Sequence, residues 1–131
     1  MPAKSRRTGG MNWIRQTTRL AIYMRDGRKC IWCRQTNSEV KRLTLDHVKT
    51  YSGGGSNDPS NLVTSCMACN ASRGAKSAKV FARYIAERTD QKPREVTRRV
   101  RNAKTRVLPR PEARALIRMN GSAKKALAAM A

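Results

Sequence analysis

The sequence predicts a small α+β fold in which short strands are held together by zinc and flanked by helices. Two Cys-x-x-Cys pairs bracket a segment with strand and turn character, and apolar residues recur at helical spacing before and after it. Only 39% of the 131 residues are apolar and six are aromatic, so a cross-link is expected to support the small core. This length suits one compact domain with extensions.

The first half of the chain predicts an arm, a helix, two strands and a helix, in that order. Residues 1–10 are basic and almost without apolar residues, which indicates a flexible basic arm. Residues 11–25 have helical apolar spacing, and Asp26-Gly27 ends that helix. Strands are expected over 42–48 and 62–64, with a wide glycine-rich loop over 52–59 and a helix from near Cys66 to near Gly74.

The second half predicts helices rich in basic residues. Residues 77–89 carry apolar residues at helical spacing, Pro93 marks a break, and residues 94–107 form a second helical stretch. A linker follows at Pro109 and Pro111, and residues 112–131 are expected to form a weak helix or a tail. The predicted organisation is an arm over 1–10, a domain over 11–76 and a basic helical C-terminal extension over 77–131.

The four cysteines form the strongest structural signal in the sequence. Cys30 and Cys33 make one Cys-x-x-Cys pair, and Cys66 and Cys69 make the other. Two such turns complete the tetrahedral four-thiolate shell that structural zinc prefers, and this shell leaves no open position for catalysis. Two disulfides, a redox-active dithiol and an iron–sulfur cluster are the alternative interpretations of the same cysteines.

The charge balance indicates a polyanionic partner. The formal net charge is +21, and such a field favours salt-sensitive binding of nucleic acid. A solubility effect and an anionic membrane surface are the alternatives. The apolar run over 20–24 is too short for a membrane span or a secretory signal, so a cytoplasmic protein is expected, with a mitochondrial targeting peptide as the alternative.

One histidine lies between the two cysteine pairs, and this position makes it a candidate for chemistry. His47 follows Asp46 directly, in a segment with strand character. A lone histidine is more often a surface or core residue, but its imidazole is also the side chain best suited to acid–base work near neutral pH. Adjacent side chains in a strand point to opposite faces, so Asp46 and His47 are expected to have different roles unless a bulge intervenes.

Several segments together resemble the HNH endonucleases of the ββα-metal superfamily, in particular small free-standing enzymes of the phage type with a four-cysteine zinc site. The resemblance spans residues 25–76 and rests on Leu45-Asp46-His47-Val48, the glycine-rich loop, Asn61-Leu62-Val63 and Cys66-Met67-Ala68-Cys69-Asn70. It implies that residues 11–76 form a nuclease domain with a zinc-stapled ββα-metal core.

The resemblance also implies roles for four residues. His47 would be the general base that activates water, and Asn61 would fix its orientation from the glycine-rich loop. Asp46 and Asn70 would bind one catalytic Mg²⁺ or Mn²⁺. Asn70 replaces a histidine found in many family members, and an amide oxygen remains a suitable ligand for a hard cation. A turn or capping role for Asn61 and a helix-start role for Asn70 are the structural alternatives.

The resemblance further implies double-stranded DNA as the partner, contacted through its backbone. Arg73 and Lys76 are the predicted phosphate contacts. A monomer in the cytoplasm of a bacterial host is expected, with phage packaging proteins as candidate partners. The alternative functions are a zinc-ribbon nucleic-acid-binding protein without catalysis, and a nuclease or toxin directed at RNA.

Overall fold

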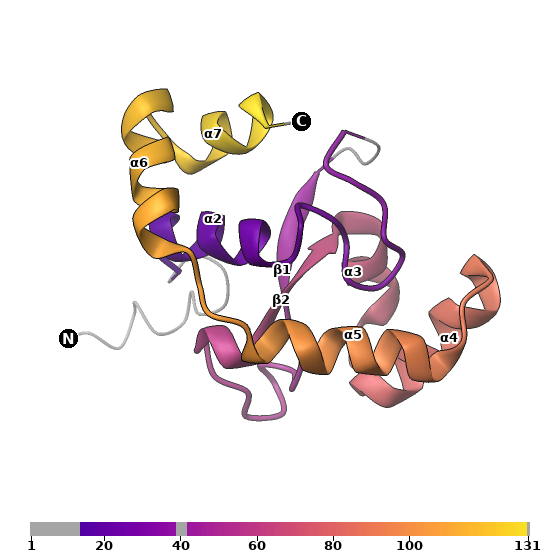
Figure 1. Ribbon diagram of the computed structural model, residues 1–131. Helices are drawn as coiled ribbons and strands as arrows, with labels where there is room; N and C mark the ends of the chain where they lie inside the picture. The colour runs from indigo at the N-terminus through magenta and orange to yellow at the C-terminus, as the bar shows by residue number, and fades with distance from the viewer. Residues whose placement is uncertain (1–13, 39–41, 131) are drawn as a thin grey trace.

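The computed structural model describes residues 14–38 and 42–130, and the statements below concern these residues (Figure 1). The arm predicted over 1–10 lies outside them. The elements in chain order are α2 (Gln16–Arg25), β1 (Leu43–His47), the 3-10 helix η2 (Pro59–Asn61), β2 (Leu62–Cys66), α3 (Met67–Arg73), α4 (Ala78–Thr89), α5 (Pro93–Thr105), α6 (Arg110–Asn120) and α7 (Ala123–Ala129).

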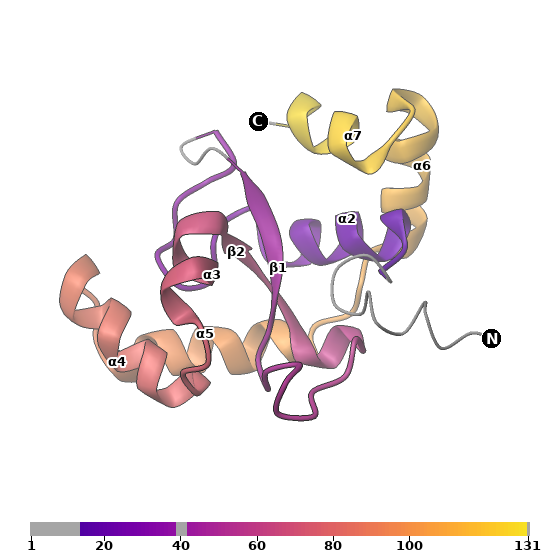
Figure 2. The ribbon, with the colours of Figure 1, turned by 180° about the vertical axis from the view of Figure 1, so that it is seen from behind.

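The centre of the fold is an antiparallel strand pair followed by a short helix. β1 and β2 pair without a bulge, from Leu43 opposite Cys66 to His47 opposite Leu62. Every residue of β2 is buried, because α2, α3 and α5 all contact this strand. Helix α3 contacts both strands and lies across one side of the pair (Figure 2). The predicted α+β class with a ββα core is therefore confirmed.

Trp32 links the first cysteine turn to the helices that follow the core. Its side chain is fully buried, and its ring meets Phe81 of α4 edge-to-face at a centroid distance of 5.1 Å. Val96 and Val100 from α5 join the same apolar core. Aromatic pairs of this kind contribute about 0.5–1.5 kcal/mol beyond the burial of their area. The α4–α5 hairpin is thus packed onto the centre of the fold.

A buried ion pair fastens the end of α2 to β2. Arg25 Nε lies 2.8 Å from Asp26 Oδ1, and both side chains are almost fully buried. Arg25 Nη2 also donates to the carbonyl oxygen of Leu62, and Asp26 Oδ2 accepts from the backbone N–H of Thr64. Because hydrogen bonds satisfy both charged groups, the pair can remain buried without an unpaired charge.

The C-terminal segment differs from the tail or weak helix predicted for it. Residues 112–131 contribute to two helices, α6 and α7, which pack against α2 (Figure 1). Gly121 supplies a left-handed φ of 95° at the end of α6, and Ser122 caps α7 by accepting from the N–H of Lys125. The predicted linker is also shorter, because Pro111 lies in the first turn of α6, where proline is tolerated.

The predicted helices over 77–89 and 94–107 are confirmed as α4 and α5. Within residues 14–38 and 42–130, no helix is both long enough and apolar enough to cross a membrane.

Candidate functional site

The four cysteines converge at one point. Their sulfur atoms all lie within 4.8 Å of one another, and none is in a disulfide. Cys33 donates its N–H to Cys30 Sγ at 3.5 Å, and Cys69 donates its N–H to Cys66 Sγ at 3.4 Å. These two contacts are equivalent, so each Cys-x-x-Cys turn presents its sulfurs in the same way.

The donor set of this cluster fits a structural zinc ion. Hydrogen bonds from Cys33, Cys66 and Cys69 lower the pKa of the Cys30 thiol. The hydrogen bond between Cys69 and Cys30 raises the pKa of Cys69. Crowding therefore prevents all four thiols from ionising together unless a cation neutralises them. Zinc supplies that charge and prefers four thiolates in a tetrahedron. The cluster is thus compatible with the predicted zinc staple.

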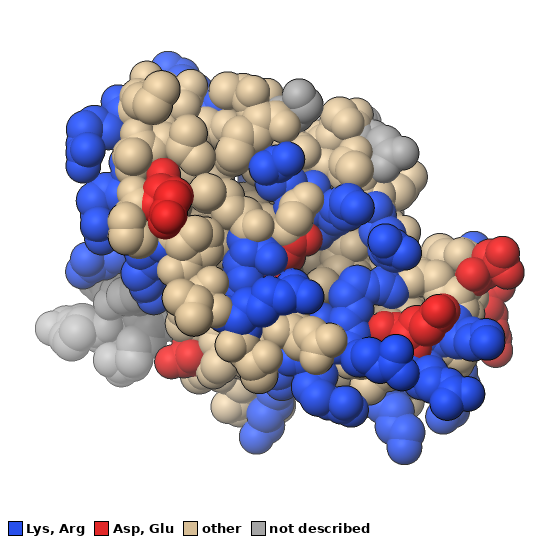
Figure 3. Space-filling model, in the orientation of Figure 1, with Lys and Arg blue, Asp and Glu red and all other residues tan. Residues whose placement is uncertain are grey.

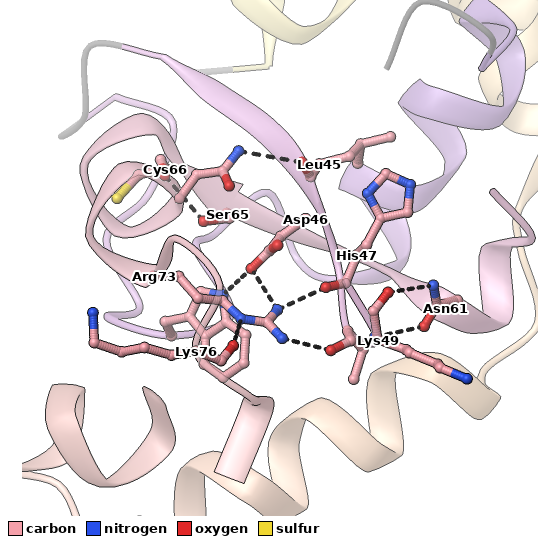
Figure 4. A network of polar contacts seen from close by, with 12 residues as sticks. Leu45, Asp46, His47, Lys49, Asn61, Ser65, Cys66, Arg73 and Lys76 are labelled. Atoms are coloured by element: carbon pink, nitrogen blue, oxygen red, sulfur yellow. Dashed lines mark hydrogen bonds and ion pairs between the residues drawn. The ribbon is translucent and has the colours of Figure 1, made fainter. Parts of the chain in front are cut away.

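Asp46 lies on β1 with its carboxylate directed into the protein, toward α3 (Figure 4). Its Oδ2 accepts hydrogen bonds of 3.0 Å from Trp32 Nε1 and of 3.0 Å from Arg73 Nη1. Burial raises the pKa of Asp46 above its usual value, and the charge of Arg73 opposes this shift. One carboxylate oxygen is therefore occupied by donors from the cysteine turn and from α3.

Arg73 is buried, with 1% of its surface exposed, although the sequence predicts a DNA phosphate contact for it. Besides Asp46, its guanidinium donates to the carbonyl oxygens of His47, Val48 and Lys76. Its donors point into the protein rather than toward solvent, as Figure 4 shows. The side chain joins the end of β1 to the end of α3. A residue that contacts DNA phosphates would be exposed, so this buried position differs from the prediction.

His47 is the last residue of β1, and its ring lies on the opposite side of the strand from Asp46 (Figure 4). No bulge interrupts the pairing, so the alternation expected from the sequence holds here. His47 Nε2 lies 2.7 Å from Asn57 Oδ1, and its ring is 5.5 Å from that of Tyr51. This contact engages Nε2, and no hydrogen bond to Nδ1 is found among the described residues.

Asn61 holds the glycine-rich loop against the end of β1. Its Oδ1 accepts from the N–H of Lys49 at 2.8 Å, and its Nδ2 donates to the carbonyl oxygens of Lys49 and Ser56. Gly55 permits this close approach, because a Cβ there would lie 1.8 Å from the Lys49 carbonyl oxygen. The loop that carries Asn57 is therefore fixed relative to His47.

Asn70 and Lys76 lie on and just after α3. Asn70 Nδ2 donates to the carbonyl oxygen of Leu45 at 3.5 Å. This hydrogen bond holds the Asn70 side chain over β1, at the residue that precedes Asp46. Lys76 is exposed, its Nζ donates to the carbonyl oxygen of Ser72, and it lies over the ring of Tyr84 at 5.3 Å. Of the two predicted phosphate contacts, only Lys76 is at the surface.

Sequence reasoning did not assign roles to Trp32, Asn57 and Gly55, which contact the predicted site residues. The position of Trp32 inside a cysteine pair was a usable signal, because that turn had to pack near the strands. Asn57 and Gly55 carried no comparable signal, since polar residues and glycines are ordinary in loops.

One comparison with known proteins gives a match. Residues 30–85 match the family model for HNH endonuclease, and this segment contains the cysteine cluster, the strand pair and α3. The comparisons with curated proteins and with solved structures give no match. The resemblance to HNH endonucleases predicted from the sequence is therefore confirmed for residues 30–85, the segment that carries this site.

Proposed function

We propose that the protein is a metal-dependent endonuclease that hydrolyses phosphodiester bonds of DNA. The observation that carries this proposal is the arrangement of Asp46 and His47 at the end of β1, with Asn70 of α3 held over that strand. This arrangement lies within the segment that matches HNH endonucleases.

His47 is the proposed general base. Its contact with Asn57 engages Nε2, so Nδ1 is the nitrogen that would take a proton from water, and the ring is only partly buried, so a water molecule can reach it. Asn61 acts as a positioning residue, because it fixes the loop from which Asn57 reaches the ring. A base with a pKa near the working pH contributes about 10²- to 10⁴-fold to hydrolysis.

Asp46 and Asn70 are the residues that would hold a catalytic Mg²⁺ or Mn²⁺. Trp32 and Arg73 both donate to Oδ2 of Asp46, which leaves Oδ1 for a cation. Asn70 turns its amide nitrogen to the Leu45 carbonyl, which leaves its amide oxygen as a ligand. Both atoms are hard oxygen donors of the type that Mg²⁺ prefers, and the ion supplies Lewis-acid stabilisation of the leaving oxygen.

Asp46 and His47 lie on opposite sides of β1 (Figure 4), so the proposal requires the end of the strand to twist when the metal ion and DNA bind, which would bring both groups to one phosphate. In an in-line reaction the attacking water and the leaving 3′ oxygen lie on opposite sides of the phosphorus atom. His47 would serve the first of these atoms, and Asp46 would serve the second through the bound ion. Both residues must therefore reach the same phosphate group. The cysteine cluster, with structural zinc, would keep the strands and α3 in register.

The test is cleavage of supercoiled plasmid by the full chain with Mg²⁺ or Mn²⁺ at low salt. His47→Ala should lower the rate by about 10²- to 10⁴-fold. Ser52→Ala, an exposed change in the same loop, should leave the rate unchanged. Products should carry a 5′ phosphate and a 3′ hydroxyl. Equal cutting by the natural chain and His47→Ala, or no cutting by the natural chain with either metal, would reject the proposal.

The second candidate function is a nucleic-acid-binding protein without catalysis. The ion pair between Asp46 and Arg73 favours it, because a carboxylate paired with a buried guanidinium is a weaker ligand for a metal ion. In that case the plasmid is bound but stays intact. A parallel assay on RNA of matched length decides whether the substrate is DNA.

A further inference from the structure

A basic groove lies between α4 and α5, and none of the candidate active site residues lines it. Its volume is about 320 Å³. Five of the seven residues that line it are basic and exposed, and none is acidic. The α4 side contributes Lys79 and Arg83, and the α5 side contributes Pro93, Arg94, Thr97, Arg98 and Arg101.

The helix periodicity arranges these cations in two rows. Lys79 and Arg83 are four residues apart, and Arg94, Arg98 and Arg101 follow one another at intervals of four and three, so each set lies along one face of its helix. At a rise of 1.5 Å per residue, the α5 row spans about 10 Å. The apolar residues of α4 and α5 face the core, which leaves the basic rows at the surface.

Three acidic residues lie on or between α4 and α5, and none of them lines the groove: Asp90 ends α4, and the other two have partners of their own. Glu95 Oε1 accepts from the N–H of Lys92 at 2.7 Å and caps α5, and Glu87 lies 3.7 Å from Arg88. Figure 3 shows that Lys and Arg gather over the region of α4 and α5. Such a concentration of like charge favours a polyanion, which releases counterions when it binds.

We propose that this α4–α5 groove binds the backbone of duplex DNA and so orients the substrate outside the cleavage site. Duplex DNA carries about one charge per 1.7 Å of axis, so about six charges fall within the roughly 10 Å of the α5 row. The inference rests on the proposed function in taking DNA as the partner. The α5 row lies outside residues 30–85, so the matched segment does not account for it.

The test compares two triple variants of the full chain with equal net charge. One carries Arg94→Gln, Arg98→Gln and Arg101→Gln in the groove. The control carries Arg114→Gln, Arg118→Gln and Lys125→Gln on α6 and α7, across the molecule from α4 (Figure 1). Binding of a 30-base-pair duplex is measured by fluorescence anisotropy over a range of KCl concentrations without divalent metal. Thermal unfolding checks that each variant is folded.

Each lost phosphate contact lowers the magnitude of the slope of log Kobs against log salt by about 0.9. The triple variant in the groove should therefore lower this magnitude by about 2 to 3, and the control variant by less than about 1. If the groove triple does not fold, Lys79→Gln with Arg83→Gln takes its place, with an expected decrease of about 2. Equal slopes for the groove and control variants would overturn the inference. A larger loss for an RNA duplex than for DNA would also overturn it.

The result is independent of catalysis. If the natural chain cuts plasmid but the groove and control variants bind alike, the groove proposal fails and the endonuclease proposal stands. If the natural chain cuts nothing but the groove variant loses slope, the endonuclease proposal fails and the groove remains a DNA-binding surface.

Discussion

Trp32 Nε1 donates a hydrogen bond of 3.0 Å to Oδ2 of Asp46. Trp32 lies between Cys30 and Cys33, so the turn that contributes half of the sulfur cluster also contacts the proposed ligand of the catalytic ion. The cysteine cluster and the proposed site of the catalytic ion are therefore connected through one side chain. Any change that moves the cysteine turn is expected to change the orientation of the Asp46 carboxylate.

Trp32→Phe is expected to weaken Mn²⁺ binding by about 10-fold or more, because the ring stays apolar but the donor that orients Asp46 is lost. Electron paramagnetic resonance titration of the full chain without DNA measures this affinity. Phe81→Leu is the matched control, since it disturbs the packing around Trp32 without removing the hydrogen bond. Equal weakening by both variants would show that packing alone controls the site.

Arg73→Met is expected to lower the free energy of unfolding by about 3–5 kcal/mol, because Asp46 would be left as a buried charge without its partner. Urea denaturation measures the change. Adding Asp46→Asn in the same chain should recover part of the loss, since the unpaired charge is removed. A loss below about 1 kcal/mol for Arg73→Met, as is usual for exposed pairs, would contradict the buried position described for this ion pair.

Asn57→Ala is expected to lower the maximal cleavage rate by about 10- to 100-fold, because His47 loses the contact that orients its ring. The Mg²⁺ concentration for half-maximal rate should not change, since Asn57 does not contact Asp46 or Asn70. Kinetics over a Mg²⁺ series separate the two quantities. A shifted Mg²⁺ requirement with an unchanged maximal rate would assign Asn57 to the metal site instead.

Gly55→Ala is expected to destabilise the fold by about 3 kcal/mol, because the added Cβ would overlap the Lys49 carbonyl and crowd the Asn61 amide. Cleavage should fall with it, since the same contacts hold the loop at His47. Gly53→Ala is the control, because its added Cβ would lie 2.8 Å from the hydroxyl of the Thr50 side chain, whereas the Cβ at Gly55 would overlap a backbone carbonyl. Similar melting temperatures for the two variants would show that the loop adjusts without Asn61.

Removal of zinc is expected to unfold the core. A mercurial reagent that attacks thiolates should release one zinc per chain, measured with a metal-sensitive dye, and circular dichroism should show the loss of helix. Chelation of Mg²⁺ alone should stop cleavage and leave the circular dichroism spectrum unchanged. A folded chain after complete loss of zinc would show that the cluster does not hold the core together.

The sequence was sufficient for the parts of the fold that depend on local spacing. The cysteine pairs, the strand pair and the helices α4 and α5 follow from residue types that recur at fixed intervals. The packing of α6 and α7 on α2 was not predicted. It joins residues far apart in the chain through small contacts such as Ala123 N–H to Gln16 Oε1, and no periodicity indicates such a pairing.

The sequence predicted which residues form the candidate site, and this prediction stays untested, whereas the contacts around those residues were not predicted. Asp46, His47 and Asn61 occur where the resemblance predicts them, Asn70 stands in place of the usual histidine, and the roles assigned to all four stay predictions. The burial of Arg73 was not visible in the sequence, because the chain has 29 basic residues and their composition does not single out the one that pairs with Asp46.

The contacts between α2 and β2 also cover an edge of the strand pair, because within residues 14–38 and 42–130 no third strand pairs with β1 or β2. On β2, the outward carbonyl of Leu62 accepts a hydrogen bond from Arg25, and the outward N–H of Thr64 donates one to Asp26. The N–H of Ile31 donates a hydrogen bond to the carbonyl oxygen of Thr64.

On β1, the outward carbonyls of Leu43, Leu45 and His47 accept from Tyr23, Asn70 and Arg73. Side chains and a turn thus occupy the positions at which a strand from a second molecule would add. Open edges promote intermolecular sheet formation and aggregation. We therefore expect the folded chain to resist this route to aggregation, and variants at Arg25 or Asp26 to lose that resistance first.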